Sequence, residues 1–155
     1  MSWQLTIKMK LGKLTLDLEL AGEDETIAII GPNGSGKSTV LRTIAGAYQP
    51  TSGVISIGER VIFDSGQGIN LQPESRNVGY VPQGYGLFNH LRVIDNVAFG
   101  LTTRQPKLKK SDARRRASEL LHSLDCGGLE HRWPATLSGG EQQRVAIARA
   151  FIGQP

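Results

Sequence analysis

Hydrophobic and polar residues alternate along the N-terminal part of the chain. The alternation covers residues 3–20, on both sides of Gly12-Lys13, and every second position from 14 to 20 is leucine. A period of two predicts a half-buried β-hairpin that turns at these two residues. The run 26–30 is almost wholly apolar and ends at a glycine. It predicts a buried strand that leads into a glycine-rich loop.

Further strand patterns follow in the first half of the chain. Residues 54–57 and 60–63 flank the turn-forming pair Gly58-Glu59 and predict a second hairpin. Residues 78–81 predict a short strand, which the next residue, a proline, would end.

Helical spacing of apolar residues predicts helices at 37–45, 112–124 and 140–152. No convincing strand pattern follows residue 83. We therefore expect an α/β lobe at residues 1–83, followed by a mainly helical lobe at 84–155.

Composition narrows the class of protein. The chain has 155 residues, a net charge of +4 and one cysteine, Cys126, which excludes a disulfide framework and favours a reducing compartment. No apolar run approaches the roughly 20 residues that span a bilayer, and no signal-peptide core is present, so we expect a soluble cytoplasmic chain. Six basic residues between positions 107 and 116 predict a solvated helix face. Because no aromatic residue lies among them to stack on bases, nucleic-acid binding is not expected.

A phosphate-binding motif follows the apolar run 26–30. It fits the pattern Gly, four residues, Gly-Lys-Ser/Thr and consists of Gly31, Pro32, Asn33, Gly34, Ser35, Gly36, Lys37, Ser38 and Thr39. Its glycines allow backbone N–H groups to curl around a triphosphate at a helix N-terminus. Lys37 is expected to reach the β- and γ-phosphates, Ser38 to ligate Mg²⁺ and Thr39 to support the α-phosphate.

A second motif begins about a hundred residues later, at a predicted helix start. Ser138 and Glu141 form a capping box, which alone indicates only where a helix begins. The N–H groups of Gly139 and Gly140 would make this helix N-terminus a second anion site. The full segment 137–150 reads Leu-Ser-Gly-Gly-Glu-Gln-Gln-Arg-Val-Ala-Ile-Ala-Arg-Ala. It resembles the signature of ATP-binding cassette (ABC) ATPases nearly letter for letter.

The resemblance to ABC ATPases implies an α/β fold, with a P-loop NTPase (RecA-like) core, antiparallel β-hairpins and a helical subdomain. It also implies a head-to-tail homodimer that holds ATP and Mg²⁺ between the phosphate loop of one copy and the signature of the other. The residues that would face the nucleotide of the second copy are Ser138, Gly139, Gly140, Glu141 and Gln142.

Other segments resemble further parts of the family. Residues 80–83 resemble the Q-loop, which implies that Gln83 contacts Mg²⁺ or the attacking water. Residues 87–91 and 96–101 resemble the importer branch, whose members bind transmembrane permease subunits at the inner face of the membrane. The implied docking surface lies near Tyr85, Leu87, Phe88 and His90. Residues 68–80 look most like molybdate-type oxyanion importers, and sulfate, sugar and polyamine importers share much of this segment.

Two features of the family are missing from this sequence. In the family, an apolar run ending in Asp-Glu follows the signature helix and supplies the glutamate that activates water, whereas this sequence ends at Pro155. We therefore expect a C-terminally incomplete ATPase that is marginally stable and inactive alone. Residues 10–13, where the family stacks adenine on an aromatic ring, offer only Leu11.

Two alternative functions remain open at this point. One is a nucleotide-binding fragment that does not hydrolyse ATP, and the other is a soluble ABC ATPase of DNA repair or translation. The segment between Gln83 and Ser138 is about fifty residues long, too short for the coiled coil of the DNA-repair members. A GTPase is disfavoured because the sequence has no Asn-Lys-x-Asp motif.

Overall fold

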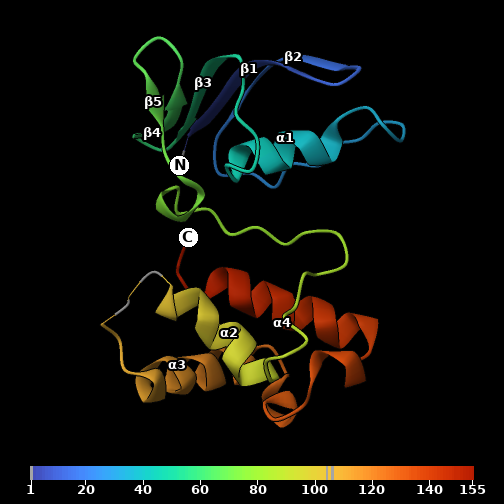
Figure 1. Cartoon of the computed structure of the whole chain (residues 1–155), viewed down its shortest axis with the longest axis vertical. Coiled ribbons are helices and arrows are strands. Elements are labelled where there is room, and N and C mark those ends of the chain that lie inside the picture. The colour runs from blue at the N-terminus through green and yellow to red at the C-terminus, as the bar shows by residue number, and fades with distance from the viewer. Residues whose placement is uncertain (1, 104, 106) are drawn as a thin grey trace. The chain divides into compact units, whose positions relative to one another are not determined.

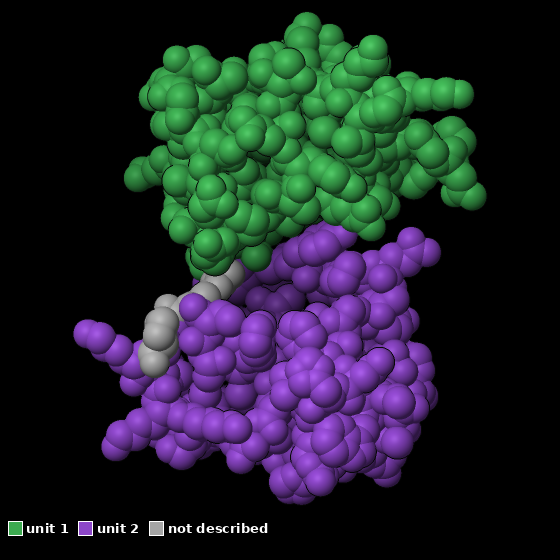
Figure 2. All heavy atoms as spheres, in the orientation of Figure 1, with its two compact units in different colours: residues 1–78 green, residues 79–155 purple. Residues whose placement is uncertain are grey.

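The structure is a computed structural model that describes residues 2–103, 105 and 107–155. The chain forms two compact units, Met1–Val78 and Gly79–Pro155 (Figure 2). Each unit has a hydrophobic core of its own. The functional domains expected from the sequence, residues 1–83 and 84–155, stay a prediction.

The first unit contains an antiparallel sheet with the strand order β2-β1-β3-β4-β5. Its strands are β1 (Trp3–Leu11), β2 (Leu14–Gly22), β3 (Ser52–Ile57), β4 (Arg60–Asp64) and β5 (Ile69–Asn70). Both predicted hairpins are confirmed. Their turns contain Gly12 and Gly58, each with a φ of 60°, a conformation that glycine adopts without steric cost.

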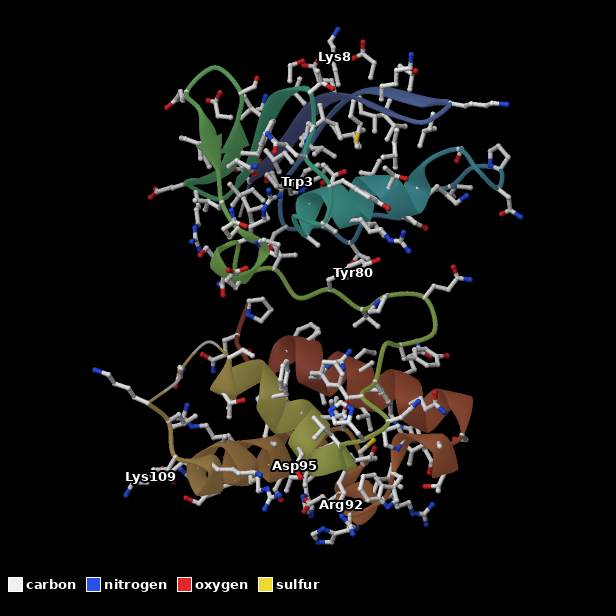
Figure 3. The ribbon with its side chains drawn as sticks, viewed as in Figure 1. Trp3, Lys8, Tyr80, Arg92, Asp95 and Lys109 are labelled. Carbon is white, nitrogen blue, oxygen red and sulfur yellow. The ribbon has the colours of Figure 1, made fainter. Side chains whose placement is uncertain are left out.

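Helix α1 (Lys37–Ile44) confirms the helix predicted at 37–45. It packs against one face of this sheet (Figure 1). Trp3 of β1 lies on the face toward α1, and Lys8 lies on the opposite face (Figure 3). There its ammonium pairs with Asp17 at 2.9 Å. The buried core of the unit comprises Leu5, Ile7, Met9, Leu16, Val40, Ile55, Ile62 and Phe63.

A buried arginine closes the C-terminal end of α1. Arg76, only 2% exposed, follows the one-turn 3-10 helix η1 (Pro73–Ser75). Its guanidinium donates to the carbonyls of Thr43 and Ile44 at 2.8 and 3.0 Å. It also donates to the Leu71 carbonyl at 2.8 Å and to the Asn70 side chain at 2.9 Å. The last carbonyls of a helix have no partner within it and carry partial negative charge, so this cation both satisfies and neutralises them.

The strand predicted at residues 26–30 is wrong for this structure. The segment is irregular, and its side chains Ile27, Ile29 and Ile30 are 49%, 39% and 92% exposed. A strand needs backbone partners, and none of the described strands pairs with this segment. Ile27 and Ile29 instead line a largely apolar cavity of about 650 Å³ beside α1. The strand predicted at 78–81 is wrong as well, since these residues too are irregular.

In the described residues of the second unit, all regular secondary structure is helical, which agrees with the mainly helical lobe that was expected. The unit contains α2 (Val93–Thr102), α3 (Lys110–Ser123) and α4 (Gly139–Phe151), with one-turn 3-10 helices η2 (Gly127–Leu129) and η3 (Pro134–Thr136). Helices α3 and α4 confirm the helices predicted at 112–124 and 140–152, whereas α2 was not predicted. Among the described residues, no helix is both long and apolar enough to span a membrane.

An ion pair joins α2 to α3 at the surface of the second unit. The Arg114 guanidinium donates to both carboxylate oxygens of Asp95 at 2.8 Å. Figure 3 labels Asp95 on α2. Hydrogen bonding from Arg114 holds the pKa of Asp95 below its usual range, although partial burial opposes this shift. The pair therefore contributes to stability only while Asp95 is ionised.

We predict that Arg76→Met lowers the free energy of unfolding by about 2–4 kcal/mol, because buried carbonyls lose a charged donor. Urea unfolding followed by circular dichroism measures this loss. Arg116→Met, which removes an exposed arginine of α3, is the matched control and should change the midpoint little. An equal effect of the two substitutions would contradict the role of Arg76.

We predict that Asp95→Asn destabilises the chain by up to about 1 kcal/mol near pH 7, as expected for an ion pair whose arginine is exposed to solvent. Because folding lowers the pKa of Asp95, the contribution of the pair is complete above the unfolded value of about 3.9. It is lost as the pH falls through the folded value. Unfolding free energies measured between pH 7 and 3 should therefore converge in acid, and a constant difference would contradict the prediction.

Candidate functional site

The phosphate-binding motif forms an exposed loop at residues 31–36 that leads directly into α1. Gly34 and Gly36 have φ angles of 83° and 94°, in the left-handed region that side chains disfavour. A Cβ on Gly36 would also lie 2.7 Å from a terminal carbon of Leu16. Both the backbone conformation and the packing of the hairpin beneath it therefore require glycine at position 36.

Lys37 places its ammonium group within the loop. Its Nζ donates to the carbonyls of Gly31 and Pro32 at 2.8 and 2.7 Å. The side chain thus folds back over the loop that precedes it, and it concentrates positive charge where the motif was expected to hold phosphate.

The N-terminus of α1 is suited to bind an anion. Its N-cap is Gly36, and in the part of the chain that the structure describes no side chain caps it and no acidic residue lies in its first turn. Its first N–H groups and its positive dipole end can therefore interact with phosphate oxygens. Ser38 is exposed in this first turn, and its expected contact with Mg²⁺ stays a prediction. The described residues contain no cluster of three or more His, Cys, Asp or Glu side chains that would hold a metal without the nucleotide.

The N-terminus of α4, by contrast, carries its own cap. The Glu141 carboxylate accepts hydrogen bonds from the backbone N–H and the hydroxyl of Ser138 at 2.7 and 2.8 Å. The Ser138 hydroxyl in turn accepts from the Glu141 N–H at 3.4 Å. The backbone hydrogen bond, followed by the one from the hydroxyl, lowers the pKa of Glu141. The predicted capping box is confirmed.

The signature residues that are expected to contact nucleotide lie in different surroundings. Gly139 and Gly140 are exposed and present backbone N–H groups without side chains. Gln142 turns inward and donates to the carbonyls of Pro134 and Leu137 at 3.2 and 3.1 Å. These contacts hold the segment that leads into α4, so nucleotide contact by Glu141 and Gln142 stays a prediction.

Gln83 is exposed in the second unit. It precedes a turn in which Gly84, Tyr85 and Gly86 all have positive φ angles. Its expected contact with Mg²⁺ or water stays a prediction. The phosphate loop lies in the first unit, and the signature lies with Gln83 in the second.

The residues expected to bind a permease form part of an aromatic cluster. The Phe88 ring lies 5.9 Å from the exposed His90 ring and 4.9 Å from Phe99, which it meets edge to face. Phe99 belongs to α2 and is 41% exposed. Its contact with Phe88 was not predicted from the sequence. Tyr85 and Leu87, which precede Phe88 in the sequence, are half-buried.

Asn96 is a second residue that sequence reasoning missed. It is completely buried, and its side chain accepts from the Phe88 N–H at 2.8 Å. The same side chain donates to the carbonyls of Phe88 and Leu91 at 3.0 Å each. The sequence shows only a single asparagine in an apolar segment. This pattern gives no information about the distant backbone groups that the side chain binds.

Comparison with known proteins agrees with this geometry. Residues 13–155 match the family model described as ABC transporter. The chain is 48% identical over 133 residues to the sulfate/thiosulfate import ATP-binding protein CysA 2 of Rhizobium meliloti, a match that covers 84% of this chain. It is 43% identical over 148 residues, 96% of its length, to the molybdate/tungstate import ATP-binding protein WtpC of Pyrococcus horikoshii. These matches span 35% and 40% of the length of the two relatives.

A solved structure supports the same assignment. It is described as the dimeric post-hydrolysis state of the ATP-binding cassette MJ0796 bound to ADP and Pi. The TM-score is 0.79 at 30% identity, over 100% of this chain and 71% of the other. This likeness confirms the expected fold class, an α/β cassette with an antiparallel sheet and helices. The chain therefore belongs to the ABC transporter family.

Proposed function

We propose that this chain is part of the ATP-binding subunit of an ABC import system, in which ATP binding and hydrolysis drive the uptake of an oxyanion. The observation that carries the proposal is the uncapped N-terminus of α1, preceded by a glycine loop whose carbonyls bind the Lys37 ammonium. A helix start with this architecture recognises phosphate through backbone N–H groups and a fixed positive charge.

Each residue of the loop has a role in this function. The backbone of residues 31–36 would bind the phosphates, Lys37 would neutralise the β- and γ-phosphates, and Thr39 would support the α-phosphate. Ser38, with Gln83, would ligate the Mg²⁺ ion that accompanies ATP. That ion would supply charge neutralisation and polarise the phosphate.

The signature provides the second half of the proposed site. Ser138, Gly139 and Gly140 would contact the γ-phosphate of ATP bound to a second copy of the chain, in a head-to-tail homodimer. Glu141 would hold the N-terminus of α4, and Gln142 the segment before it. A related cassette is described as dimeric and bound to ADP and Pi, which supports this arrangement.

The aromatic cluster is the proposed docking surface for transmembrane permease subunits. Phe88 and His90, with Tyr85 and Leu87 nearby, combine apolar area with polar groups, as protein interfaces do. Docking there would locate the protein at the inner face of the cell membrane.

The proposed substrate is a tetrahedral oxyanion such as sulfate or molybdate. The named relatives are sulfate/thiosulfate and molybdate/tungstate import proteins, at 48% and 43% identity. Both classes of anion are doubly charged and tetrahedral, so a single importer branch can serve them with different binding proteins. The resemblance of residues 68–80 to molybdate importers favours molybdate, whereas the higher identity favours sulfate.

We predict that Lys37→Ala lowers the affinity for MgATP about 10- to 100-fold, because a contact to a charged group contributes about 1.5–3 kcal/mol. Equilibrium binding of a fluorescent ATP analogue measures this change. Lys109→Ala, at the exposed residue that precedes α3, is the matched control and should bind as the unmodified chain does. Unchanged affinity of the Lys37 variant would contradict the proposed site.

We predict that Ser138→Asp keeps nucleotide binding but abolishes ATP-dependent dimerisation. Aspartate can still accept the Glu141 N–H as an N-cap, although it loses the hydroxyl that donates to the Glu141 carboxylate and repels that carboxylate, so a small loss of stability is expected. Its charge would also repel the γ-phosphate of the other copy. Sedimentation velocity with and without Mg-AMP-PNP separates monomer from dimer, and thermal unfolding checks the fold. A Ser138→Asp chain that still dimerises with nucleotide would rule out the shared site.

A further inference from the structure

A short left-handed turn separates Gln83 from the proposed docking surface. Gly84, Tyr85 and Gly86 have φ angles of 74°, 65° and 60°. This region is disfavoured for Tyr85, whose side chain crowds the backbone there. A Cβ on Gly86 would lie 2.9 Å from the ring of Pro82. Such a turn persists only where its surroundings hold it in place.

Arg149 holds this turn from the last turn of α4. Its guanidinium donates to the carbonyls of Gly86 and Tyr85 at 2.8 and 3.1 Å. The same group lies over the Phe88 ring, 5.0 Å from its centre. Burial lowers the pKa of Arg149, which is half-buried among these partners. One planar group thus binds two successive carbonyls and the first aromatic residue beyond them.

The other end of α4 meets the same turn. A Cβ on Gly139 would lie 4.0 Å from the hydroxyl oxygen of Tyr85. The Tyr85 hydroxyl therefore lies near the signature N-terminus, while the backbone of this residue is bound by Arg149 ten residues further along the helix. A shift of α4 along its axis would act on the turn through Arg149.

Asn96 fixes the segment that follows the turn. Its buried side chain binds the N–H and the carbonyl of Phe88, and also the carbonyl of Leu91. Residues 85–91 are therefore held by α4 through Arg149 and by α2 through Asn96. The ring of Phe88 lies at the junction of the two sets of contacts.

We propose that Arg149 is a positioning residue that binds the Gly84–Gly86 turn to the signature helix, so that engagement of Ser138–Gly140 by nucleotide is transmitted to the docking surface at Phe88 and His90. The part of this inference that concerns transmission rests on the proposed function. The part that concerns the turn rests on the contacts of Arg149 alone.

A lysine at position 149 should keep only part of the role of Arg149. A lysine keeps the positive charge but offers a single ammonium group, which cannot bind two successive carbonyls in the fixed geometry of a guanidinium. Methionine keeps apolar contact with the Phe88 ring and removes both the charge and the donors. Both variants keep a long side chain, so the loss that they share reports the paired hydrogen bonds of the guanidinium, and the difference between them reports the remaining charge.

Hydrogen–deuterium exchange of the nucleotide-free chain tests the turn. Arg149→Met should raise the exchange rates of amides 84–91 about tenfold or more, and Arg149→Lys should raise them less. Amides 113–121 of α3 should not change. Arg115→Met, which removes an exposed arginine paired with Glu119 at 2.9 Å, is the matched control and should leave residues 84–91 unchanged. Unchanged rates at 84–91 in Arg149→Met, or equal increases at 113–121, would overturn the proposal.

The same measurement with Mg-AMP-PNP tests the transmission. In the unmodified chain, nucleotide should slow exchange at residues 84–91. In Arg149→Lys, which retains more of the native contacts than Arg149→Met, nucleotide should slow this exchange less. The nucleotide affinity of Arg149→Lys should be unchanged. A full response in both Arg149 variants would overturn the transmission. An unmodified chain that binds no nucleotide would contradict the proposed function, while the nucleotide-free experiment would still decide the role of Arg149.

Discussion

The peptide groups at the two ends of α1 have no partners within the helix, and this constraint determines how the first unit is organised. Two carbonyls at its C-terminal end, those of Thr43 and Ile44, accept hydrogen bonds from the buried guanidinium of Arg76. The N–H groups at its N-terminal end meet a glycine loop and no side-chain cap among the described residues. The protein therefore neutralises one pole of the helix dipole and leaves the other for an external anion. The sheet beneath α1 holds both ends in place through its apolar face.

The second unit uses buried polar side chains to shape a segment without regular structure. Residues 85–91 form neither helix nor strand, so their backbone groups need partners from elsewhere. Asn96 and Arg149 provide them from two different helices. Because each of these side chains binds more than one backbone group, replacing either would remove several backbone hydrogen bonds at once. The same contacts that satisfy the backbone also fix the position of Phe88.

What could be predicted from sequence depended on how local the interactions are. The leucines at alternate positions of residues 14–20 predicted a hairpin, because that pattern is satisfied by an immediate neighbour in the chain. The phosphate loop and the capping box at Ser138 were also predicted, since their hydrogen bonds lie within a few residues. The strand predicted at 26–30 was wrong, because a buried strand needs partners from distant parts of a sheet, and none of the described strands pairs with this segment. The roles of Asn96 and Arg149 likewise depend on distant backbone groups that no local pattern reveals.

The two helix N-termini differ in a way that bears on the order of events under the proposed function. At α1, the approaching phosphate would displace only the contacts of Lys37 with its own loop, and a lysine can turn from a carbonyl to a phosphate without losing its charge. At α4, the Ser138 hydroxyl and N–H are already bound to the Glu141 carboxylate, which is itself an anion. A phosphate would have to replace those bonds against repulsion from Glu141, so the net gain at the signature is smaller. Nucleotide would therefore occupy the phosphate loop first, and contact with the signature of the second copy would follow.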